Sequence, residues 1–302
     1  MAPWSGVFPA VTTKLKADGS IDLPATQSSI ERLVANGVSG VIVLPMLGEN
    51  ASLRMSEKEA VIRAGKEAVA GKVPLLSGLA EISTESAVAT ARAFESYGAE
   101  GLMAFPSLGY KTDPRETATW YKTLGTGCGL PIMIYNNPIA YGVDVTPAIL
   151  DDLAGTPSIV AIKEETGDIR RVTDLYNAHG NRFRIFCGVD DLIVESMSLG
   201  AVGWVSGMTN AWPKQCVEIF NLCAAGRFAE ALPLYRLMTP AFHLDTDVKL
   251  VQYIKLAEHL VYGAPEWVRP PRLPIEGAER ARVVAVISKT IEDLAKGVKQ
   301  AA

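Results

Sequence analysis

One lysine stands near the end of a strongly apolar stretch, Ile159-Val-Ala-Ile-Lys-Glu164. Successive side chains of a β-strand point to opposite faces, so Ile159, Ala161 and Lys163 are expected on one face. If that face is enclosed, dry surroundings and the positive ends of nearby helices both disfavour the ammonium form. A neutral amine could then attack the carbonyl carbon of a 2-oxo acid. The competing interpretation is a strand-end lysine whose amine simply reaches water.

A tyrosine, Tyr135, occupies the same place in a second apolar run, Pro131-Ile-Met-Ile-Tyr-Asn136. A phenol at this depth, one strand away, could donate and accept protons while an imine forms and a carbon acid loses its proton. The alternative is a core tyrosine whose hydroxyl merely finds a partner. A further candidate is the loop Pro45-Met-Leu-Gly-Glu-Asn50, where Gly48 and free backbone amides could hold a carboxylate.

These candidates need elements that bring the ends of several strands together. Eight apolar runs of strand length lack polar alternation: 6–12, 40–45, 73–78, 101–106, 131–136, 159–164, 183–188 and 202–205. Such runs are typical of parallel strands buried on both faces, and eight β-then-α units favour a closed (β/α)8 TIM barrel. In a TIM barrel the active site lies at the C-terminal strand ends, where Lys163 and Tyr135 fall. We expect the barrel over residues 1–225 and a helical extension over 226–302.

Local signals predict several boundaries of these elements. The pattern Gly-x-x-Gly begins at Gly37, Gly98 and Gly200. The first glycine of each pair suits a left-handed helix C-cap, and the second starts a strand. Helix starts are predicted at Ser56-Glu-Lys-Glu59, Asp113-Pro-Arg-Glu116 and Thr146-Pro147. About three extra helices should follow the eighth strand, interrupted by an extended connector over Pro265–Pro274.

The composition is that of an ordinary globular protein, with 302 residues, 48% of them hydrophobic and 21% charged, and a net charge of -4. No run of Lys and Arg predicts binding to nucleic acid or to an anionic membrane, and no apolar run approaches the ~18 residues that cross a bilayer. The four cysteines and three histidines show no metal-ligand spacing. We therefore expect a cytoplasmic protein with a small-molecule partner and no metal.

Four motifs follow the second, fifth, sixth and seventh predicted strands: Gly48-Glu49, Tyr135-Asn-x-Pro138, Lys163-Glu-x-Thr-Gly-Asp168 and Cys187-Gly-Val-Asp-Asp191. Together they resemble the family of dihydrodipicolinate synthase and N-acetylneuraminate lyase, which are Schiff-base lyases on a TIM barrel. The resemblance implies that Lys163 forms the imine and that Tyr135 transfers protons. It places the substrate site at Met46, Leu47, Gly48, Gly188 and Val205. It also implies that no cofactor is used and that two or four subunits assemble.

Three positions depart from the family pattern. Met46 and Leu47 stand where the synthase and the sialic acid lyase carry two hydroxyl residues, so backbone amides must hold the substrate carboxylate. The relay tyrosine that a neighbouring subunit lends in the synthase is missing, and Tyr110 is the available substitute. Ala140 replaces an arginine that grips a second carboxylate, and a methyl group cannot replace that clamp. The resemblance thus implies a smaller substrate with one carboxylate.

Within the family, several segments are most similar to the branch of 1-pyrroline-4-hydroxy-2-carboxylate deaminase. They are Phe8–Thr13, Leu47–Asn50, Tyr135–Pro138, Val251–Leu256 and Glu266–Arg269. This likeness implies a step of hydroxyproline degradation, in which a cyclic imine becomes 2,5-dioxopentanoate and ammonia. Two alternatives stay open. One is a 2-keto-3-deoxy sugar acid dehydratase, such as 2-keto-3-deoxy-L-arabonate dehydratase, or an aldolase that yields pyruvate, and the other is a non-catalytic 2-oxo acid sensor.

Overall fold

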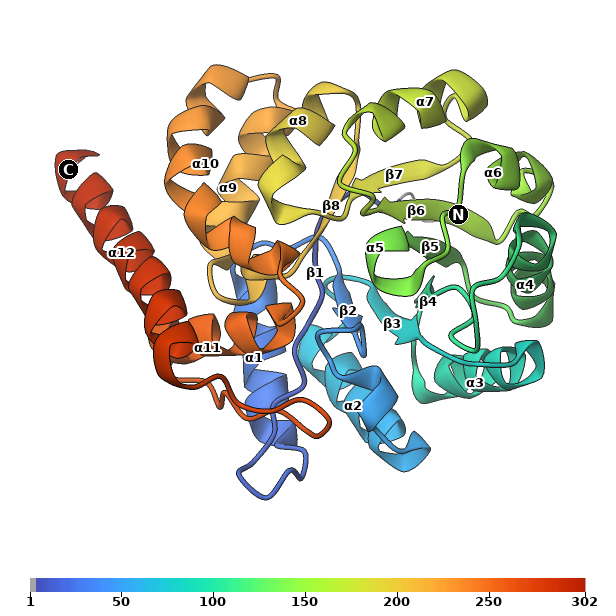
Figure 1. The fold of residues 1–302 in the computed structure, drawn as a ribbon, viewed down its shortest axis with the longest axis horizontal. Helices are drawn as coiled ribbons and strands as arrows, with labels where there is room; N and C mark the ends of the chain where they lie inside the picture. Colours follow the sequence, from blue (N-terminus) through green and yellow to red (C-terminus); the bar gives the residue numbers. More distant parts are fainter. Residues whose placement is uncertain (1–3, 302) are drawn as a thin grey trace.

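Eight parallel strands form the centre of the molecule, with helices around them (Figure 1). The computed structural model describes residues 4–301, with side chains from 4 to 297. The strands are β1 (Gly6–Pro9), β2 (Val41–Val43), β3 (Leu75–Leu79), β4 (Gly101–Ala104), β5 (Ile132–Asn136), β6 (Ile159–Glu164), β7 (Arg184–Cys187) and β8 (Gly203–Ser206). Each strand lies within or against one of the eight apolar runs, and the predicted TIM barrel is confirmed.

Helices connect the strands and cover the outside of the barrel. They are α1 (Leu23–Ala35), α2 (Met55–Val69), α3 (Thr84–Tyr97), α4 (Pro114–Gly127), α5 (Pro138–Tyr141), α6 (Pro147–Leu153), α7 (Arg170–His179), α8 (Ile193–Ser198) and α9 (Pro213–Ala224). Short 3-10 turns are η1 (Asn50–Ser52), η2 (Asp190–Leu192), η3 (Met208–Asn210) and η4 (His243–Thr246). Each strand leads into loops and helices at its C-terminal end, so those loops gather at one mouth of the barrel.

The barrel closes at a seam between β1 and β2. Continuous ladders join the strands in the order β1-β8-β7-β6-β5-β4-β3-β2. Between β1 and β2 the described residues make an isolated parallel bridge of Ala10 with Ile42. The Val11 amide donates to the Ile42 carbonyl at 2.9 Å. The seam is therefore the most weakly paired joint of the barrel.

A register shift at the start of β6 corrects one prediction. Ile159 pairs with Ile132 and packs in the outer core between strands and helices. The register then shifts, so that Ala161 pairs with Met133 inside the barrel. Because an extra residue reverses the alternation, Ile159 does not share the face of Lys163, whereas Ala161 does.

Glycines shape three joints between a helix and a strand. Positive φ angles of 85°, 108° and 102° confirm the predicted left-handed conformation at Gly37, Gly98 and Gly200. The strand-starting glycines make room for aromatic rings. A Cβ atom on Gly203, for example, would lie 2.2 Å from the ring of Phe186. These three joints therefore depend on glycine at both positions, for backbone conformation and for space.

Two of the three predicted helix starts are confirmed. Asp113 caps α4, and its Oδ1 accepts the Glu116 amide at 2.8 Å. Thr146 precedes α6, whose first residue is the predicted proline. The capping box at Ser56 is wrong, because α2 begins at Met55 and the Arg54 amide donates to Glu57 at 2.8 Å. The acidic residue that completes the cap thus lies two positions earlier than predicted.

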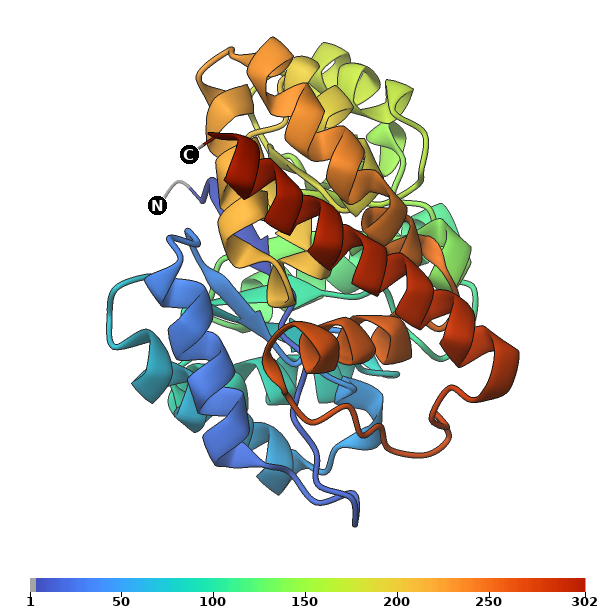
Figure 2. The ribbon, with the colours of Figure 1, turned by 90° about the vertical axis from the view of Figure 1, so that its left-hand side faces the viewer.

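Three helices follow the barrel, as predicted: α10 (Phe228–Phe242), α11 (Leu250–Tyr262) and α12 (Gly277–Ala301). Figure 2 shows α12 lying diagonally across the outside of the molecule, beside α10 and α11. The predicted connector, Pro265–Pro274, lies between α11 and α12 and contains neither helix nor strand. Helix α12 contacts α10 and α11, and α10 in turn contacts α8 and α9 of the barrel, so the C-terminal segment packs against the outer helices.

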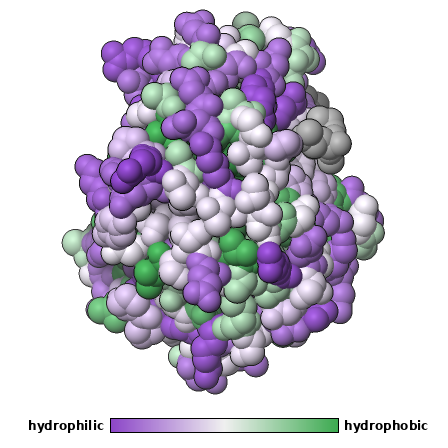
Figure 3. Space-filling view, turned by 90° about the vertical axis from the view of Figure 1, so that its right-hand side faces the viewer, coloured by the Kyte–Doolittle hydropathy of each residue, from purple (hydrophilic) through white to green (hydrophobic). Residues whose placement is uncertain are grey.

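The outer surface shows no large hydrophobic area on the face over α4 and α6. Figure 3 shows hydrophilic and intermediate residues there, with small separated hydrophobic spots. Within residues 4–301, no helix combines the length and apolar character that crossing a membrane requires.

Candidate active site

Lys163 and Tyr135 lie side by side at the barrel mouth, because the register of β5 and β6 pairs them directly. The side chain of Lys163 is 8% exposed. Its Nζ lies 4.1 Å from the centre of the Tyr135 ring. The amine also forms an ion pair with Glu165, which follows β6. The structure therefore brings a buried amine, a phenol and a carboxylate together.

The charged side chains around Lys163 were not predicted from the sequence, which indicated only the positive ends of nearby helices. They are carboxyl groups: Glu165 in the ion pair, and Asp190 and Asp245 nearby. Burial raises the pKa of Asp190 to about 7. Burial, and then the negative charges of Asp190 and Glu165, raise the pKa of Asp245 well above its usual range. The site thus combines one carboxylate paired with the amine, Glu165, and two buried carboxyl groups whose pKa is raised.

The hydroxyl of Tyr135 is linked to Glu165 through Asn137. The Asn137 side-chain nitrogen donates to the Tyr135 oxygen at 3.2 Å and to Glu165 Oε1 at 3.0 Å. Burial, and then the charge of Glu165, raise the pKa of Tyr135 well above its usual range. The phenol is therefore neutral and can act as a proton donor.

The loop after β2 holds two backbone amides available to a ligand. The amides of Gly48 and Glu49 donate within the turn, to Pro45 at 3.1 Å and to Met46 at 2.9 Å. In the described part of the chain, the amides of Met46 and Leu47 have no hydrogen-bond partner. Because buried backbone amides need partners, these two are the groups of the loop that can hold a carboxylate. The Gly48 amide is used by the turn itself.

Glu49 anchors this loop to the C-terminal extension. It has a left-handed backbone, with φ of 56°, and its buried carboxylate pairs with Lys255 of α11. The Arg269 amide donates to the same carboxylate at 2.9 Å, and Lys255 also donates to the Trp267 carbonyl at 2.7 Å. Burial lowers the pKa of Lys255 to about 8. The loop that carries the two free amides is thus held by Lys255 and Arg269, which lie 206 and 220 positions away in the sequence.

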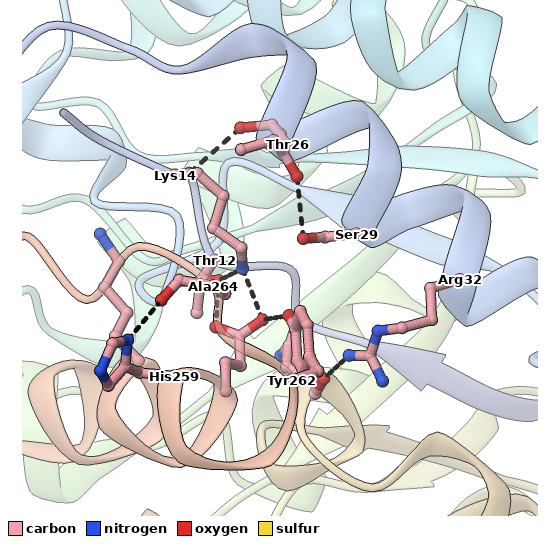
Figure 4. A network of polar contacts seen from close by, with 12 residues as sticks. Thr12, Lys14, Thr26, Ser29, Arg32, His259, Tyr262 and Ala264 are labelled. Carbon is pink, nitrogen blue, oxygen red and sulfur yellow. Dashed lines mark hydrogen bonds and ion pairs between the residues drawn. The ribbon is translucent and has the colours of Figure 1, made fainter.

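A second buried ion pair joins α11 to the segment that follows β1. Lys14 is fully buried, pairs with Glu258 and also contacts the hydroxyl of Thr12. Thr12 in turn donates to Glu258 at 2.6 Å. Figure 4 shows Lys14 extending toward Thr12, with Tyr262 of α11 beside Arg32 of α1. Helix α11 therefore contacts the chain just beyond both strands of the seam.

Two cavities meet at the barrel mouth. The inner chamber, of about 20 Å³, contains Lys163 and Tyr135, and an outer cavity of about 870 Å³ opens toward solvent. Four residues line both and form what we call the neck: Met46, Glu165, Asp245 and Leu250. A substrate bonded to Lys163 must extend through the neck into the outer cavity.

The predicted substrate-binding residues fall into two groups. Met46 and Leu47 line the inner chamber with Lys163 and Tyr135. Gly48, Gly188 and Val205 do not belong to the walls of either cavity. Gly188 instead supports the lysine, because a Cβ atom there would lie 3.0 Å from Lys163 Cε. Val205 is buried in the barrel interior beneath the site.

A second phenol lines the outer cavity, and it is not Tyr110. Tyr110 is 62% exposed, and its hydroxyl donates to Glu116 at 2.9 Å. Tyr141 lines the outer cavity instead, with its ring centre 5.6 Å from that of Tyr135. Burial raises the pKa of Tyr141 as well. Sequence reasoning missed Tyr141, although it follows the Tyr135 motif by only a few residues.

A buried strand-end lysine beside a neutral phenol, under two amides suited to a carboxylate, defines the class of protein: a Schiff-base lyase on a TIM barrel. The chain belongs to the dihydrodipicolinate synthetase family, which it matches over residues 3–290. The predicted family is therefore confirmed. Because the members of this family are class I lyases and aldolases, the chain is an enzyme of this kind and not a non-catalytic sensor.

Individual relatives span nearly the whole chain. A 4-hydroxy-tetrahydrodipicolinate synthase of Methanospirillum hungatei is 30% identical and covers 91% of this chain and 94% of its own length. A probable 2-dehydro-3-deoxy-D-pentonate aldolase of Escherichia coli is 31% identical, over 84% of this chain and 87% of its own. The solved 4-hydroxy-tetrahydrodipicolinate synthase of Methylacidiphilum fumariolicum superposes with a TM-score of 0.91, at 26% identity, over 97% and 98% of the two chains.

Proposed function

We propose that this enzyme deaminates 1-pyrroline-4-hydroxy-2-carboxylate, through an imine between Lys163 and C2 and elimination of the hydroxyl at C4. The observation that carries the proposal is the grouping of Lys163, Tyr135 and Glu165 in one inner chamber. These groups supply a nucleophile, a neutral proton donor and a carboxylate base. The amides of Met46 and Leu47 would hold the single carboxylate of the substrate.

The proposed reaction begins with attack of the Lys163 amine on C2. The ring bond between C2 and nitrogen breaks, and Tyr135 gives a proton to the departing nitrogen. The resulting protonated imine acidifies C3, and Glu165 takes the C3 proton to leave an enamine. The C4 hydroxyl departs as water, and the double bond shifts until C5 carries an imine. Two waters then hydrolyse the imines at C5 and C2, so that one water is consumed overall and ammonia and 2,5-dioxopentanoate are released.

The residues that replace the family's polar groups support a small substrate. Ala140 lines the outer cavity where the synthase would place an arginine. Met46 and Leu47 present apolar side chains to the inner chamber where hydroxyl groups would stand. Position 140 thus provides no partner for a second carboxylate, in keeping with a substrate that carries one carboxylate.

A second candidate function is cleavage or dehydration of a 2-keto-3-deoxy sugar acid. The Escherichia coli relative named as a probable 2-dehydro-3-deoxy-D-pentonate aldolase supports it. So does the outer cavity, where Asp191 and Asp247 could accept hydrogen bonds from sugar hydroxyls. This candidate keeps the Lys163 imine and changes only the bond that breaks afterwards.

The test is an assay of the purified enzyme with both substrates. With the hydroxypyrroline we expect ammonia and 2,5-dioxopentanoate, and none of either from the Lys163→Ala variant. With the 2-keto-3-deoxy acid, pyruvate would reveal an aldolase and 2,5-dioxopentanoate a dehydratase. Borohydride reduction followed by peptide mass mapping should place the adduct on Lys163. An enzyme that releases no ammonia from the hydroxypyrroline would refute the first candidate.

A further inference from the structure

Asp245 lies in the active site although it belongs to the C-terminal extension. It is part of η4, is 9% exposed, and lines both the inner chamber and the outer cavity. Its carboxyl group packs against the bare backbone of Gly207, where a Cβ atom would lie 2.3 Å from Oδ1. Within the described residues it makes neither a hydrogen bond nor an ion pair. Its oxygens reach the space of the cavities that it lines, so the carboxyl group is available to a ligand in the neck.

The groups that face Asp245 are mostly negative. Asp190 and Asp191 approach from η2 and Glu165 from the loop after β6, while Lys163 is the cation among them. Burial and these charges raise the pKa of Asp245 well above its usual range, which favours the protonated form of the carboxyl group. Glu165, the other acid of the neck, is paired with the Lys163 amine. Two carboxyl groups in unlike environments are suited to opposite roles, one as acid and one as base.

We propose that Asp245 is the general acid that protonates the hydroxyl leaving from C4. This inference rests on the proposed function. With C2 bonded to Lys163 in the inner chamber and C5 in the outer cavity, C3 and C4 lie in the neck. Asp245 and Glu165 are the two titratable residues among the four that line it.

The step balances without any further reactant. The enamine electrons re-form the imine at C2 and make a double bond between C3 and C4, while the bond between C4 and oxygen breaks. Asp245 gives its proton to the departing oxygen, so water leaves and Asp245 becomes a carboxylate. Retro-aldol cleavage would instead need a base to remove the proton of the C4 hydroxyl. A protonated acid at this place therefore selects elimination, and with it 4-hydroxy 2-oxo acids or their cyclic imines as the substrate class.

The experiment compares two leaving groups in the wild type and in Asp245→Asn. The substrates are 4-hydroxy-1-pyrroline-2-carboxylate and its 4-fluoro analogue, because fluoride leaves without being protonated. Asp245→Asn should release ammonia from the hydroxy compound about 10²- to 10⁴-fold more slowly, as expected for loss of a general acid. It should process the fluoro compound within a few-fold of the wild type, measured as fluoride release. The borohydride adduct on Lys163 should form as before.

Two further variants serve as controls. Glu165→Gln removes the other acid of the neck and should slow both substrates alike, since it acts before the leaving group departs. Asp174→Asn makes the same chemical change on an exposed position of α7 and should change neither rate.

Each of the other possible outcomes contradicts either the role of Asp245 or the proposed function. Equal ammonia release by the wild type and Asp245→Asn would overturn the role of Asp245 and leave the proposed function intact. Equal losses of rate with both substrates would show that Asp245 has only a structural role, and would also overturn its role as general acid. A wild type that releases no ammonia from the hydroxy compound would overturn the proposed function, and this inference with it.

Discussion

Removal of Lys255 should destabilise the protein strongly, although the residue lies outside the inner chamber. The side chains of Lys255 and Glu49 both have 0% of their surface exposed. Without Lys255, the Glu49 carboxylate would keep the Arg269 amide but lose its counter-charge. Breaking one partner of a buried ion pair costs about 3–5 kcal/mol, because the remaining charge stays in the protein interior. At about 2 °C per kcal/mol for a large domain, the unfolding midpoint of Lys255→Met should fall by about 6–10 °C.

Thermal unfolding followed by circular dichroism at pH 7 measures this effect. The double variant Glu49→Gln with Lys255→Met should regain most of the loss, because no charge is left unpaired. Lys249→Met is the matched control, since Lys249 pairs with Glu279 at the surface and such pairs contribute about 0–1 kcal/mol. A Lys255→Met protein that melts within about 2 °C of the wild type would refute the reasoning, as would a double variant as unstable as the two single losses combined.

Three further outcomes are expected. Tyr135→Phe should still give the borohydride adduct on Lys163, because the nucleophile is intact. Its kcat should fall about 10²- to 10⁴-fold, because a proton donor is lost. An unchanged kcat would exclude this role of Tyr135. Gly188→Ala should slow adduct formation, measured by the rate of trapping, because its Cβ would crowd the Lys163 side chain. Since burial lowers the pKa of Lys255 from 10.5 to about 8, the native protein loses that proton before the unfolded chain does. The difference in the free energy of unfolding between the wild type and Lys255→Met, measured by denaturant titration, should therefore grow between about pH 8 and 10.5.

The strands could be predicted because burial on both faces produces continuous apolar runs. The left-handed glycines at the helix ends were equally visible, since few other residues adopt that conformation. The position of Ile159 could not be predicted from alternation. Its neighbour Val160 is also apolar, so nothing in the pattern marks the extra residue that shifts the register. At Ser56 two acidic residues compete to complete the cap, and the structure uses Glu57.

The candidate site was predictable only where strands build it. Lys163 and Tyr135 stood out as polar side chains at the ends of buried apolar runs, and parallel register makes them neighbours. Glu165 and Asp245 gave no such signal, because both lie in loops or turns where acidic residues are common. Asp245 reaches the neck through long-range packing of the extension on the barrel, which local patterns do not record. The carboxyl groups around the lysine could not be predicted for the same reason.

The weak seam between β1 and β2 has a consequence for how the protein is made. Just beyond these strands, Lys14 and Glu49 each pair with a residue of α11, Glu258 and Lys255. Helix α11 thus connects the segments that follow the two strands of the seam, and it leaves the ribosome after all eight strands have been synthesised. A nascent chain that ends near residue 225 contains all eight strands of the barrel but neither α11 nor Asp245. The residues that brace the seam and the acid that lines the neck are therefore both added late in the synthesis of the chain.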